Sequence, residues 1–338
     1  MKTSRLLLML ALSMPLGGIL SGCKDANDHS GAAASTPLPS SAPAVARKKV
    51  ALVMKTLTNP FFIEMERGAR RAEKEFGVEL TVKTGSDETA VEQQIQIVDD
   101  LIQAHVDAIV IAPGDSQRVV SILKKAQSAG IVIINIDNQL DPGVAASQQM
   151  KPVPFVSADN DRGGYLIGKY LADQIKKPAQ AVIFEGIRSA ANAQMRMSGA
   201  RRAFSENPNI HLVASESANW KIDEAHDLAE KIFKEHPQVS VVFCANDMMA
   251  LGVVKYLQDS GRKNVMVAGY DALEEAKQAV KAGSMTATVD QQADEQGYQG
   301  VALAVRALKG ESVPASVMVD TRIVNAASLS RASNQANQ

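Results

Sequence analysis

Short apolar runs alternate with stretches of helical spacing from residue 49 onward. Runs rich in Val and Ile predict buried strands at residues 50–54, 78–82, 108–112, 131–136 and 154–157. Between them, apolar residues recur at spacings of three and four, which predicts helices over residues 62–76, 88–104 and 116–128. Strands that alternate with helices form βαβ units, so the pattern predicts a parallel sheet with helices on both faces.

The alternation starts again after residue 161. It predicts strands at residues 181–184, 211–214, 239–244, 265–268 and 285–289. It predicts helices at residues 163–174, 193–205, 223–235, 247–259, 273–282 and 294–308, followed by one closing strand near 317–324. Two similar α/β lobes fit 338 residues better than one large sheet, and their boundary is expected near residues 157–161.

The first 22 residues have the features of a signal peptide. Two basic residues precede an apolar run over residues 6–20, which is short for a membrane span. The following Leu20-Ser21-Gly22-Cys23 resembles a bacterial lipobox, so we expect residues 1–22 to be removed and Cys23 to carry a lipid anchor. The alternative is a plain secretory signal with an incidental cysteine.

Residues 23–46 are rich in Ala, Ser and Pro and have no apolar period. Such a segment cannot bury enough apolar surface to fold, so it predicts a flexible tether. Residues 328–338 form a similarly polar tail. Together these segments predict a protein that is anchored to a membrane at the periplasmic side, or at the cell surface in a Gram-positive cell.

Composition narrows the possible partners. The formal net charge of −1 argues against a nucleic-acid partner, which would require a basic patch. Cys23 and Cys244 do not form a disulfide framework, and Cys244 lies in an apolar run where a buried free thiol is expected. Aromatic residues make up only 4% of the chain, so those near a candidate site stand out.

Residues 55–62 join the first predicted strand to the first predicted helix. Pro60 suits the first helical position and Asn59 the N-cap before it, while Lys55 follows the strand directly. Ligands bind at the carboxyl ends of strands in such sheets. Helical neighbours point about 100° apart, so one of Phe61 and Phe62 is expected to face a crevice, unless both are core residues.

Other strand ends carry polar residues of the same kinds. They include Asp137-Asn138, a loop leading to Arg196, Asn219-Trp220, Asn246-Asp247, Tyr270-Asp271 and Asp290-Gln291. Helix capping is the alternative explanation, and it suits Asn246 and Asp271 individually. Helix capping does not require Arg, Gln or Trp at the ends of strands, so the whole set indicates a ligand site.

Residues 49 to about 325 resemble the periplasmic sugar-binding proteins of ABC transporters, of the ribose/allose type with the type I binding-protein fold. The resemblance implies two lobes joined by a multi-strand hinge: residues 47–158 with about 292–318, and residues 159–291 with about 319–327. It rests on Lys55-Thr56-Leu57-Thr58-Asn59-Pro60-Phe61-Phe62, Asn135-Ile136-Asp137, Arg196 with Gly199, Ser217-Ala218-Asn219-Trp220, Phe243-Cys244-Ala245-Asn246-Asp247-Met248-Met249-Ala250-Leu251-Gly252, Gly269-Tyr270-Asp271 and Ala287-Thr288-Val289-Asp290-Gln291.

The resemblance implies that a monosaccharide is bound as the lobes close and is then presented to a membrane permease, without a cofactor or metal. The implied ligand contacts are Lys55, Asn59, Phe61, Phe62, Asp137, Asn138, Arg196, Trp220, Asn246, Asp271 and Gln291. Lys55 and Trp220 look most like allose-binding members. Asn138 departs from the pattern, since ribose binders carry Arg there and allose binders an acidic residue, which leaves the sugar open. The residue types agree with a sugar ligand, because aromatic rings pack on its C–H faces and carboxylates accept from its hydroxyls.

Three other functions compete with sugar uptake. An enzyme would need a nucleophile and base at the site, but the five histidines fall elsewhere, and the Asp137–Asp271 pair matches positions that only bind sugar in the family. A transcription regulator of the same fold would need a helix-turn-helix where the signal peptide stands. A sensor of a sugar-like signal, without transport, stays open. We expect a monomer that binds sugar and a permease, with a chemoreceptor as a further partner, and no nucleic acid.

Overall fold

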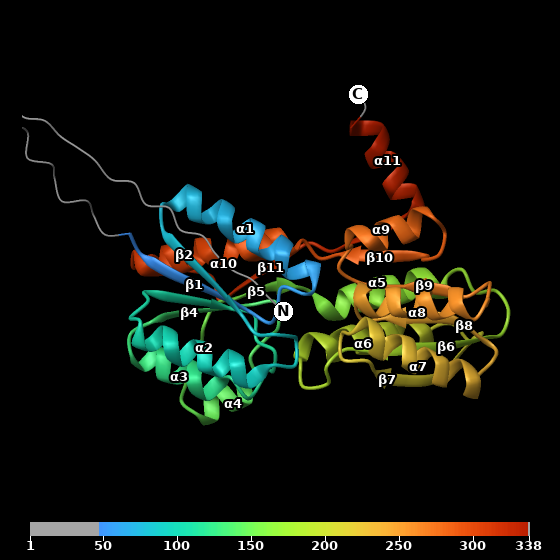
Figure 1. Ribbon diagram of the computed structural model, residues 1–338, viewed down its shortest axis with the longest axis horizontal. Coiled ribbons are helices and arrows are strands. Elements are labelled where there is room, and N and C mark those ends of the chain that lie inside the picture. The colour runs from blue at the N-terminus through green and yellow to red at the C-terminus, as the bar shows by residue number, and fades with distance from the viewer. Residues whose placement is uncertain (1–46, 337–338) are drawn as a thin grey trace, which may run out of the picture. The chain divides into compact units, whose positions relative to one another are not determined.

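The computed structural model describes residues 47–336, which fold into two α/β lobes (Figure 1). The predicted signal peptide, the lipidation site Cys23 and the tether lie outside these residues. Among the described helices, none is both long and apolar enough to cross a membrane. The predicted class, two lobes that each contain a sheet flanked by helices, is confirmed.

The first lobe is built on a six-stranded sheet in which all neighbouring strands are parallel. In spatial order its strands are β11 (Ser316–Val319), β5 (Phe155–Ala158), β4 (Val132–Ile136), β3 (Ala108–Ile111), β1 (Lys49–Met54) and β2 (Glu79–Thr84). Its helices are α1 (Pro60–Phe76), α2 (Val91–Gln103), α3 (Val120–Ser128), the short α4 (Pro142–Ser147) and α10 (Ala293–Leu308).

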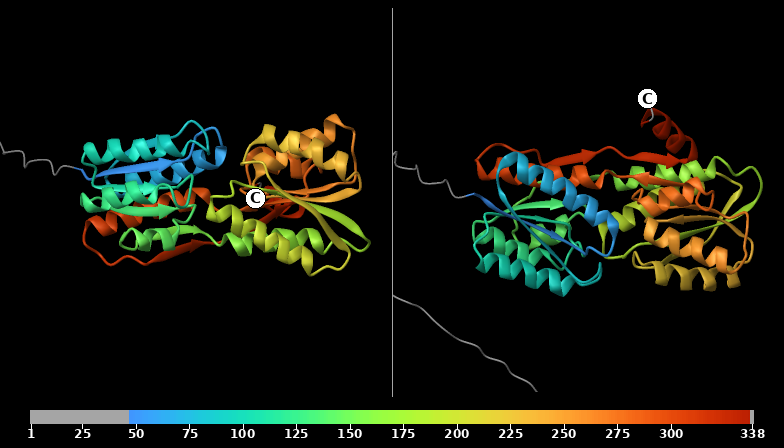
Figure 2. Two further views of the ribbon diagram at one scale, coloured as in Figure 1. Left: turned by 90° about the horizontal axis from the view of Figure 1, so that it is seen from below. Right: turned by 45° about the horizontal axis from the view of Figure 1, so that its top comes forward.

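Strand β1 is buried on both faces, as its continuous apolar sequence predicts. Val50 and Leu52 belong to the core that includes residues of α1 and α10, whereas Ala51 and Val53 belong to the core that includes residues of α2 and α3. Successive side chains of a strand point to opposite faces, so this single strand separates two helical layers. Figure 2 shows the helices on both sides of each sheet.

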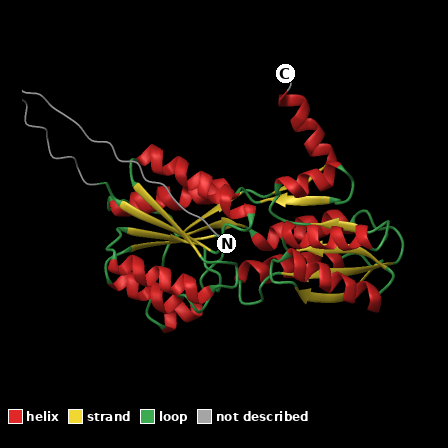
Figure 3. Cartoon of the chain, viewed as in Figure 1, coloured by secondary structure: helices red, strands yellow, loops and turns green. Residues whose placement is uncertain are grey.

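The second lobe has a sheet of the same size, parallel except at one edge. Its strands in spatial order are β12 (Arg322–Asn325), β10 (Ala287–Asp290), β9 (Met266–Ala268), β8 (Val239–Cys244), β6 (Ala179–Glu185) and β7 (Ile210–Ser217), with β12 antiparallel to β10. Its helices are α5 (Asn160–Ala172), α6 (Ala191–Ser205), α7 (Ile222–Glu235), α8 (Asp247–Asp259) and α9 (Glu274–Lys281), seen around the strands in Figure 3.

The end of the chain differs from the prediction in two ways. The single closing strand expected near residues 317–324 is two strands, because Asp320 and Thr321 carry the chain from β11 in the first sheet to β12 in the second. The polar tail is not without structure, since α11 (Ala326–Ala336) projects from the second lobe beside α9 (Figure 1). Its many alanines favour a helix despite the polar composition.

Within residues 47–336 the chain passes between the sheets three times, after β5, after β10 and between β11 and β12. The two lobes belong to one compact unit. Direct hydrogen bonds join them, including that from the Asn192 side chain to Asp137 Oδ1 at 3.2 Å. The structure is therefore the closed form of a two-lobed protein.

Candidate functional site

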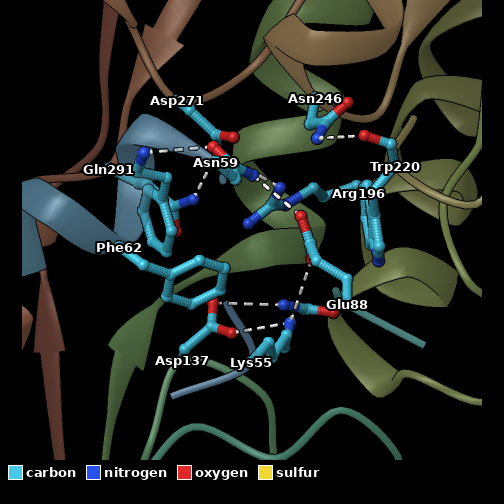
Figure 4. Close-up of a pocket in the computed structure, with 12 residues that line it drawn as sticks. Lys55, Asn59, Phe62, Glu88, Asp137, Arg196, Trp220, Asn246, Asp271 and Gln291 are labelled. Carbon is cyan, nitrogen blue, oxygen red and sulfur yellow. Dashed lines mark hydrogen bonds and ion pairs between the residues drawn. The ribbon is translucent and has the colours of Figure 1, made fainter. Parts of the chain in front are cut away.

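A cavity lies between the lobes where the carboxyl ends of both sets of strands face each other. It has an empty volume of about 230 Å³. Twelve residues line it: Lys55, Asn59, Phe61, Phe62, Glu88, Asp137, Asn192, Arg196, Trp220, Asn246, Asp271 and Gln291. Figure 4 shows their side chains converging from both lobes.

The first lobe contributes a buried group of opposite charges. Lys55 Nζ lies 2.9 Å from Asp137 Oδ2 and 3.9 Å from Glu88 Oε2. The amide of Asn59 donates to Glu88 Oε1 at 2.8 Å. Burial raises the pKa of Glu88, opposed by the Lys55 charge and this hydrogen bond. Close pairing is what makes buried charges tolerable, so each of these groups depends on the others.

The second lobe contributes Arg196, whose guanidinium is fixed from several directions. Its Nε donates to Asn160 Oδ1 at 2.8 Å and its Nη1 to the Ala245 carbonyl at 2.9 Å. The guanidinium also lies over the rings of Tyr270, at 3.9 Å, and Trp220, at 5.6 Å. Stacking and bonding to fixed groups leave the side chain little freedom, so it meets a ligand already oriented.

Two glycines make the placement of Arg196 possible. A Cβ on Gly164 of α5 would lie 2.2 Å from the Arg196 carbonyl oxygen, and one on Gly199 of α6 would lie 2.1 Å from the Asp161 carbonyl oxygen. The helices α5 and α6 therefore approach backbone to backbone, and a larger residue at either place would separate them. Gly199 was noted in the sequence for its family match, and this contact is its physical reason.

Asp271 is the buried carboxylate that the second lobe brings to the cavity. Gln291 Nε2 donates to its Oδ1 at 2.6 Å, while Arg196 Nη1 is 3.5 Å away. Burial raises the pKa of Asp271 to about 7 in the closed protein, although Arg196 and the Gln291 hydrogen bond oppose the shift. Two other polar atoms of the lining, Asn192 Oδ1 and Trp220 Nε1, have no hydrogen-bond partner within residues 47–336. Buried polar atoms are normally paired, so the closed cavity suits a ligand with several hydroxyls.

Three lining residues have left-handed backbone conformations that are uncommon outside glycine. The φ angles are 62° at Asp137, 69° at Trp220 and 113° at Asp271. Each lies in a loop at the carboxyl end of a strand, where the turn aims the side chain into the cavity. Such strained residues persist only where surrounding structure holds them, and they concentrate at functional sites.

Capping and lining are combined in two of the predicted residues. Asn59 caps α1 by accepting from Phe61 N at 3.0 Å, and Asn246 caps α8 by accepting from Met249 N at 2.9 Å. Both also line the cavity, so the two explanations offered for such residues are compatible. Asp271 is not the cap of α9, whose N-cap residue is Leu273.

The structure places ten of the eleven predicted contacts in the cavity lining and the other outside it. Asn138 does not line the cavity. It is fully buried, and its side chain donates to the Pro113 carbonyl at 3.1 Å and accepts from Asn192 N at 3.2 Å. Asp137 and Asn138 are neighbours in a tight turn, so their side chains point in different directions.

Phe61 and Phe62 were expected to divide between the sheet and a crevice. Both line the cavity, with their rings edge to face and the ring centroids 5.1 Å apart.

Glu88 and Asn192 are lining residues that the sequence prediction missed. Glu88 was assigned to the start of a helix, but α2 begins only at Val91, so Glu88 lies in the loop after β2. The same rule that selected the other strand ends would have found it. Asn192 lies in the first turn of α6, just after a loop whose length hid its position.

The described residues contain no group of three or more His, Cys, Asp and Glu side chains arranged to hold a metal ion. Cys244 is buried, and burial raises the pKa of its thiol well above the ordinary value. His105, His211, His226 and His236 are absent from the cavity lining. The lining therefore contains the groups for binding hydroxyls but not a nucleophile paired with a histidine base.

Comparison with known proteins identifies the family. Residues 50–312 match the family model described as the periplasmic binding protein domain. The chain is 40% identical over 269 residues to the D-ribose/D-allose-binding protein of Pseudomonas aeruginosa, covering 79% of this chain and 84% of that protein.

Two solved structures agree with this match. An ABC transporter solute-binding protein from Burkholderia multivorans, with an unknown ligand, superposes with a TM-score of 0.80 at 37% identity, covering 83% of this chain and all of that one. A periplasmic solute-binding protein from Actinobacillus succinogenes with bound D-allose gives a TM-score of 0.79 at 35% identity, covering 84% of this chain and all of that one. The chain thus belongs to the periplasmic binding protein family, and its predicted resemblance to the ribose/allose type is confirmed.

Proposed function

We propose that this protein is the substrate-binding component of an ABC sugar importer and binds one monosaccharide between its lobes. The observation that carries the proposal is the composition of the cavity, where buried carboxylates, cations and amides from both lobes lie between aromatic rings. Membership of the family implies a location outside the cytoplasm and a role in transport rather than catalysis.

The aromatic rings suit the two faces of a sugar ring. Phe62 comes from the first lobe and Trp220 from the second, and they lie on opposite sides of the polar groups in Figure 4. The π faces of aromatic rings carry partial negative charge and attract polarised C–H groups. A pyranose held between them would present its belt of hydroxyls to the charged side chains.

The polar groups suit the hydroxyls. Asp137 and Asp271 would each accept from hydroxyl groups, while Arg196 and Asn246 would donate to hydroxyl or ring oxygens. Hydrogen bonds to charged partners contribute about 1.5–3 kcal/mol each. A few of them, after the costs of association, reach the roughly −8 kcal/mol of a micromolar complex.

We place D-allose ahead of D-ribose as the ligand. Lys55 and Trp220 resemble allose-binding members, and the Actinobacillus protein of similar fold holds D-allose, while the Pseudomonas relative is named for both sugars. Asn138, which had left the choice open, is not among the residues that line the cavity. The lining carries both signs of charge, which favours an unmodified, uncharged sugar.

Closure links binding to delivery. Neither lobe supplies the full set of contacts, so a bound sugar favours the closed state in which both sets are made. The permease would recognise that state. The lipobox at residues 20–23 supports a lipid anchor on Cys23, with the segment that follows it serving as a tether.

Calorimetry against a panel of pentoses, hexoses and sugar alcohols tests the ligand. Micromolar or tighter binding of D-allose, with weaker binding of D-ribose, is expected, because an inverted or missing hydroxyl leaves buried groups unpaired. Binding only to an amino acid or a phosphate ester, or to nothing in the panel, would overturn the proposal.

Mass spectrometry of the mature protein extracted from membranes tests the anchor. The expected N-terminal residue is Cys23 bearing a diacylglyceryl group. A product that starts elsewhere and partitions into the aqueous phase would rule out the anchor without bearing on the sugar.

A further inference from the structure

Helix α6 begins without a capping side chain of its own. Its N-cap residue is Ala190, which has the extended backbone of a cap (φ −98°, ψ 124°) but no side-chain hydrogen bond. The first N–H groups of a helix have no partner within the helix, and Ser, Thr, Asn or Asp at the N-cap usually supplies one. In α1 and α8 that role falls to Asn59 and Asn246, each from its own lobe.

The missing acceptors come from the opposite lobe. Ala191 N donates to Ser116 Oγ at 3.0 Å, and Asn192 N donates to Asn138 Oδ1 at 3.2 Å. A backbone bond from Ser116 N to the Ser189 carbonyl, at 3.1 Å, reinforces the contact. Ser116 follows β3 and Asn138 follows β4, so both belong to the first lobe, whereas α6 belongs to the second.

Both acceptors are held by contacts within the first lobe. Asn138 is held by its own donation to the Pro113 carbonyl at 3.1 Å and by Asn135, whose amide donates to the Asn138 carbonyl at 2.8 Å. The Ser116 hydroxyl donates to Asn138 Oδ1 at 3.3 Å, which leaves its lone pairs directed to a donor such as Ala191 N. The first lobe therefore presents a ready-made cap to the end of α6.

The same helix carries two residues of the cavity lining, Asn192 and Arg196. Capping from the first lobe requires α6 to be in its closed position, which is also the position that brings Arg196 to the ligand. When the lobes part, the first N–H groups of α6 exchange Ser116 and Asn138 for water. The capping bonds are thus made only in the closed state.

We propose that Ser116 and Asn138 form an interlobe cap that stabilises the closed state and so sets how tightly and how long sugar is held, although neither residue lines the cavity. The inference rests on the proposed function for its effect on sugar. The cap itself is a property of the protein alone. In this proposal Asn138 positions α6, whereas the sequence predicted that it contacts the ligand.

Two substitutions, one in each lobe, test the cap. Ser116→Ala removes one acceptor, and we expect D-allose affinity to weaken roughly fivefold, through faster dissociation. Ala190→Ser gives α6 a cap within its own lobe. It should raise the melting temperature of the sugar-free protein while weakening D-allose binding, because the first turn no longer needs the closed state. Ser128→Ala, which removes a hydroxyl from α3 of the same lobe, is the matched control.

A readout without sugar separates this inference from the proposed function. NMR-detected amide exchange of the full sugar-free chain at Ala191 and Asn192 should quicken in Ser116→Ala and stay unchanged in Ser128→Ala, because these amides are protected only when capped. If the wild-type protein binds neither D-allose nor D-ribose but exchange responds in this way, the sugar proposal fails and the cap stands. Exchange that is the same in wild type and Ser116→Ala, or equal losses of affinity in Ser116→Ala and Ser128→Ala, would overturn the cap.

Discussion

The two lobes compensate the charges that they bring to the cavity by different means. In the first lobe, Lys55 lies between Asp137 and Glu88, so opposite charges neutralise one another within one lobe. In the second, Arg196 is held by a carbonyl, an amide and aromatic faces, and its distance to Asp271 is 3.5 Å. The first half of the site is therefore a group of ion pairs that depend on one another. The second half is a preorganised cation, held mainly by uncharged groups, beside one carboxylate.

The largest effect is expected where the first lobe's ion-pair group is broken. Lys55→Met leaves two buried carboxylates without their cation in the closed state, which costs about 3–5 kcal/mol, or roughly two to four orders of magnitude in sugar affinity. Calorimetric titration with D-allose measures this loss of affinity. Adding Asp137→Asn to Lys55→Met should recover part of the stability of the closed state but not the lost sugar contact. A Lys55→Met protein that binds as tightly as wild type would show that the group is not coupled.

The second lobe should respond differently. Asp271→Ala removes one charged acceptor and should weaken binding by about 1.5–3 kcal/mol. The melting temperature of the sugar-free protein should be unchanged or higher, since residues that crowd charge into a binding cleft are poorly placed to stabilise it. Calorimetry and a thermal melt on the same sample test both parts. Failure of the variant to fold would make Asp271 structural and contradict the assignment.

A smaller effect is expected from the packing behind Trp220. A Cβ on Gly186 would lie 2.1 Å from the indole, so Gly186→Ala must displace the ring. Overpacking of this kind typically costs about 1–3 kcal/mol, and here it would fall on sugar affinity. The double variant Gly186→Ala with Trp220→Phe should bind better than Gly186→Ala alone, because the smaller ring restores the space. Equal affinities for the two would mean that the indole position does not matter.

The smallest effect on affinity is expected from pH. In an open cleft Asp271 would titrate near its ordinary pKa of 3.8, whereas in the closed sugar-free protein its pKa is about 7. Because the raised pKa belongs to the closed state, closure takes up a proton between about pH 4 and 7, so the closed population should grow as pH falls and shrink as pH rises through 7. Burial shifts Glu88 in the same direction.

Protonation favours closure but removes an acceptor for sugar, so the two effects oppose each other in the measured affinity. Small-angle scattering of the sugar-free protein at pH 5 and pH 8 would report the closed population directly. The Asp271→Asn variant should show a flatter pH dependence than wild type. If the pH dependence of the variant equals that of wild type, groups other than Asp271 cause it.

Much of the fold could be predicted from the sequence, because buried parallel strands are apolar throughout and their helices carry a clear spacing. Strand β8 and helix α8 have the predicted bounds. The closing segment could not be resolved into β11 and β12, because the two short strands pair with different sheets and only tertiary structure separates them. Nor does a polar composition reveal that the tail forms α11.

The site was predictable in outline because strand ends in such sheets face a common cleft. What the sequence did not reveal is where a side chain points within a turn. Asp137 lines the cavity and Asn138 does not, although they are adjacent and equally polar. Glu88 was missed because a loop residue was assigned to a helix. The residue type can be read from the chain, but its direction depends on backbone angles such as the φ of 62° at Asp137.

The passage of the chain between the sheets has a consequence for the order of folding. The first lobe needs α10 and β11, which come from the last part of the chain, and α10 packs against α1. A nascent chain therefore cannot complete its N-terminal core until residue 319 has been made, and contacts of such long sequence separation form slowly. The signal peptide predicted for residues 1–22 would require the chain to cross a membrane before it folds, and late completion of the first lobe would leave time for that step.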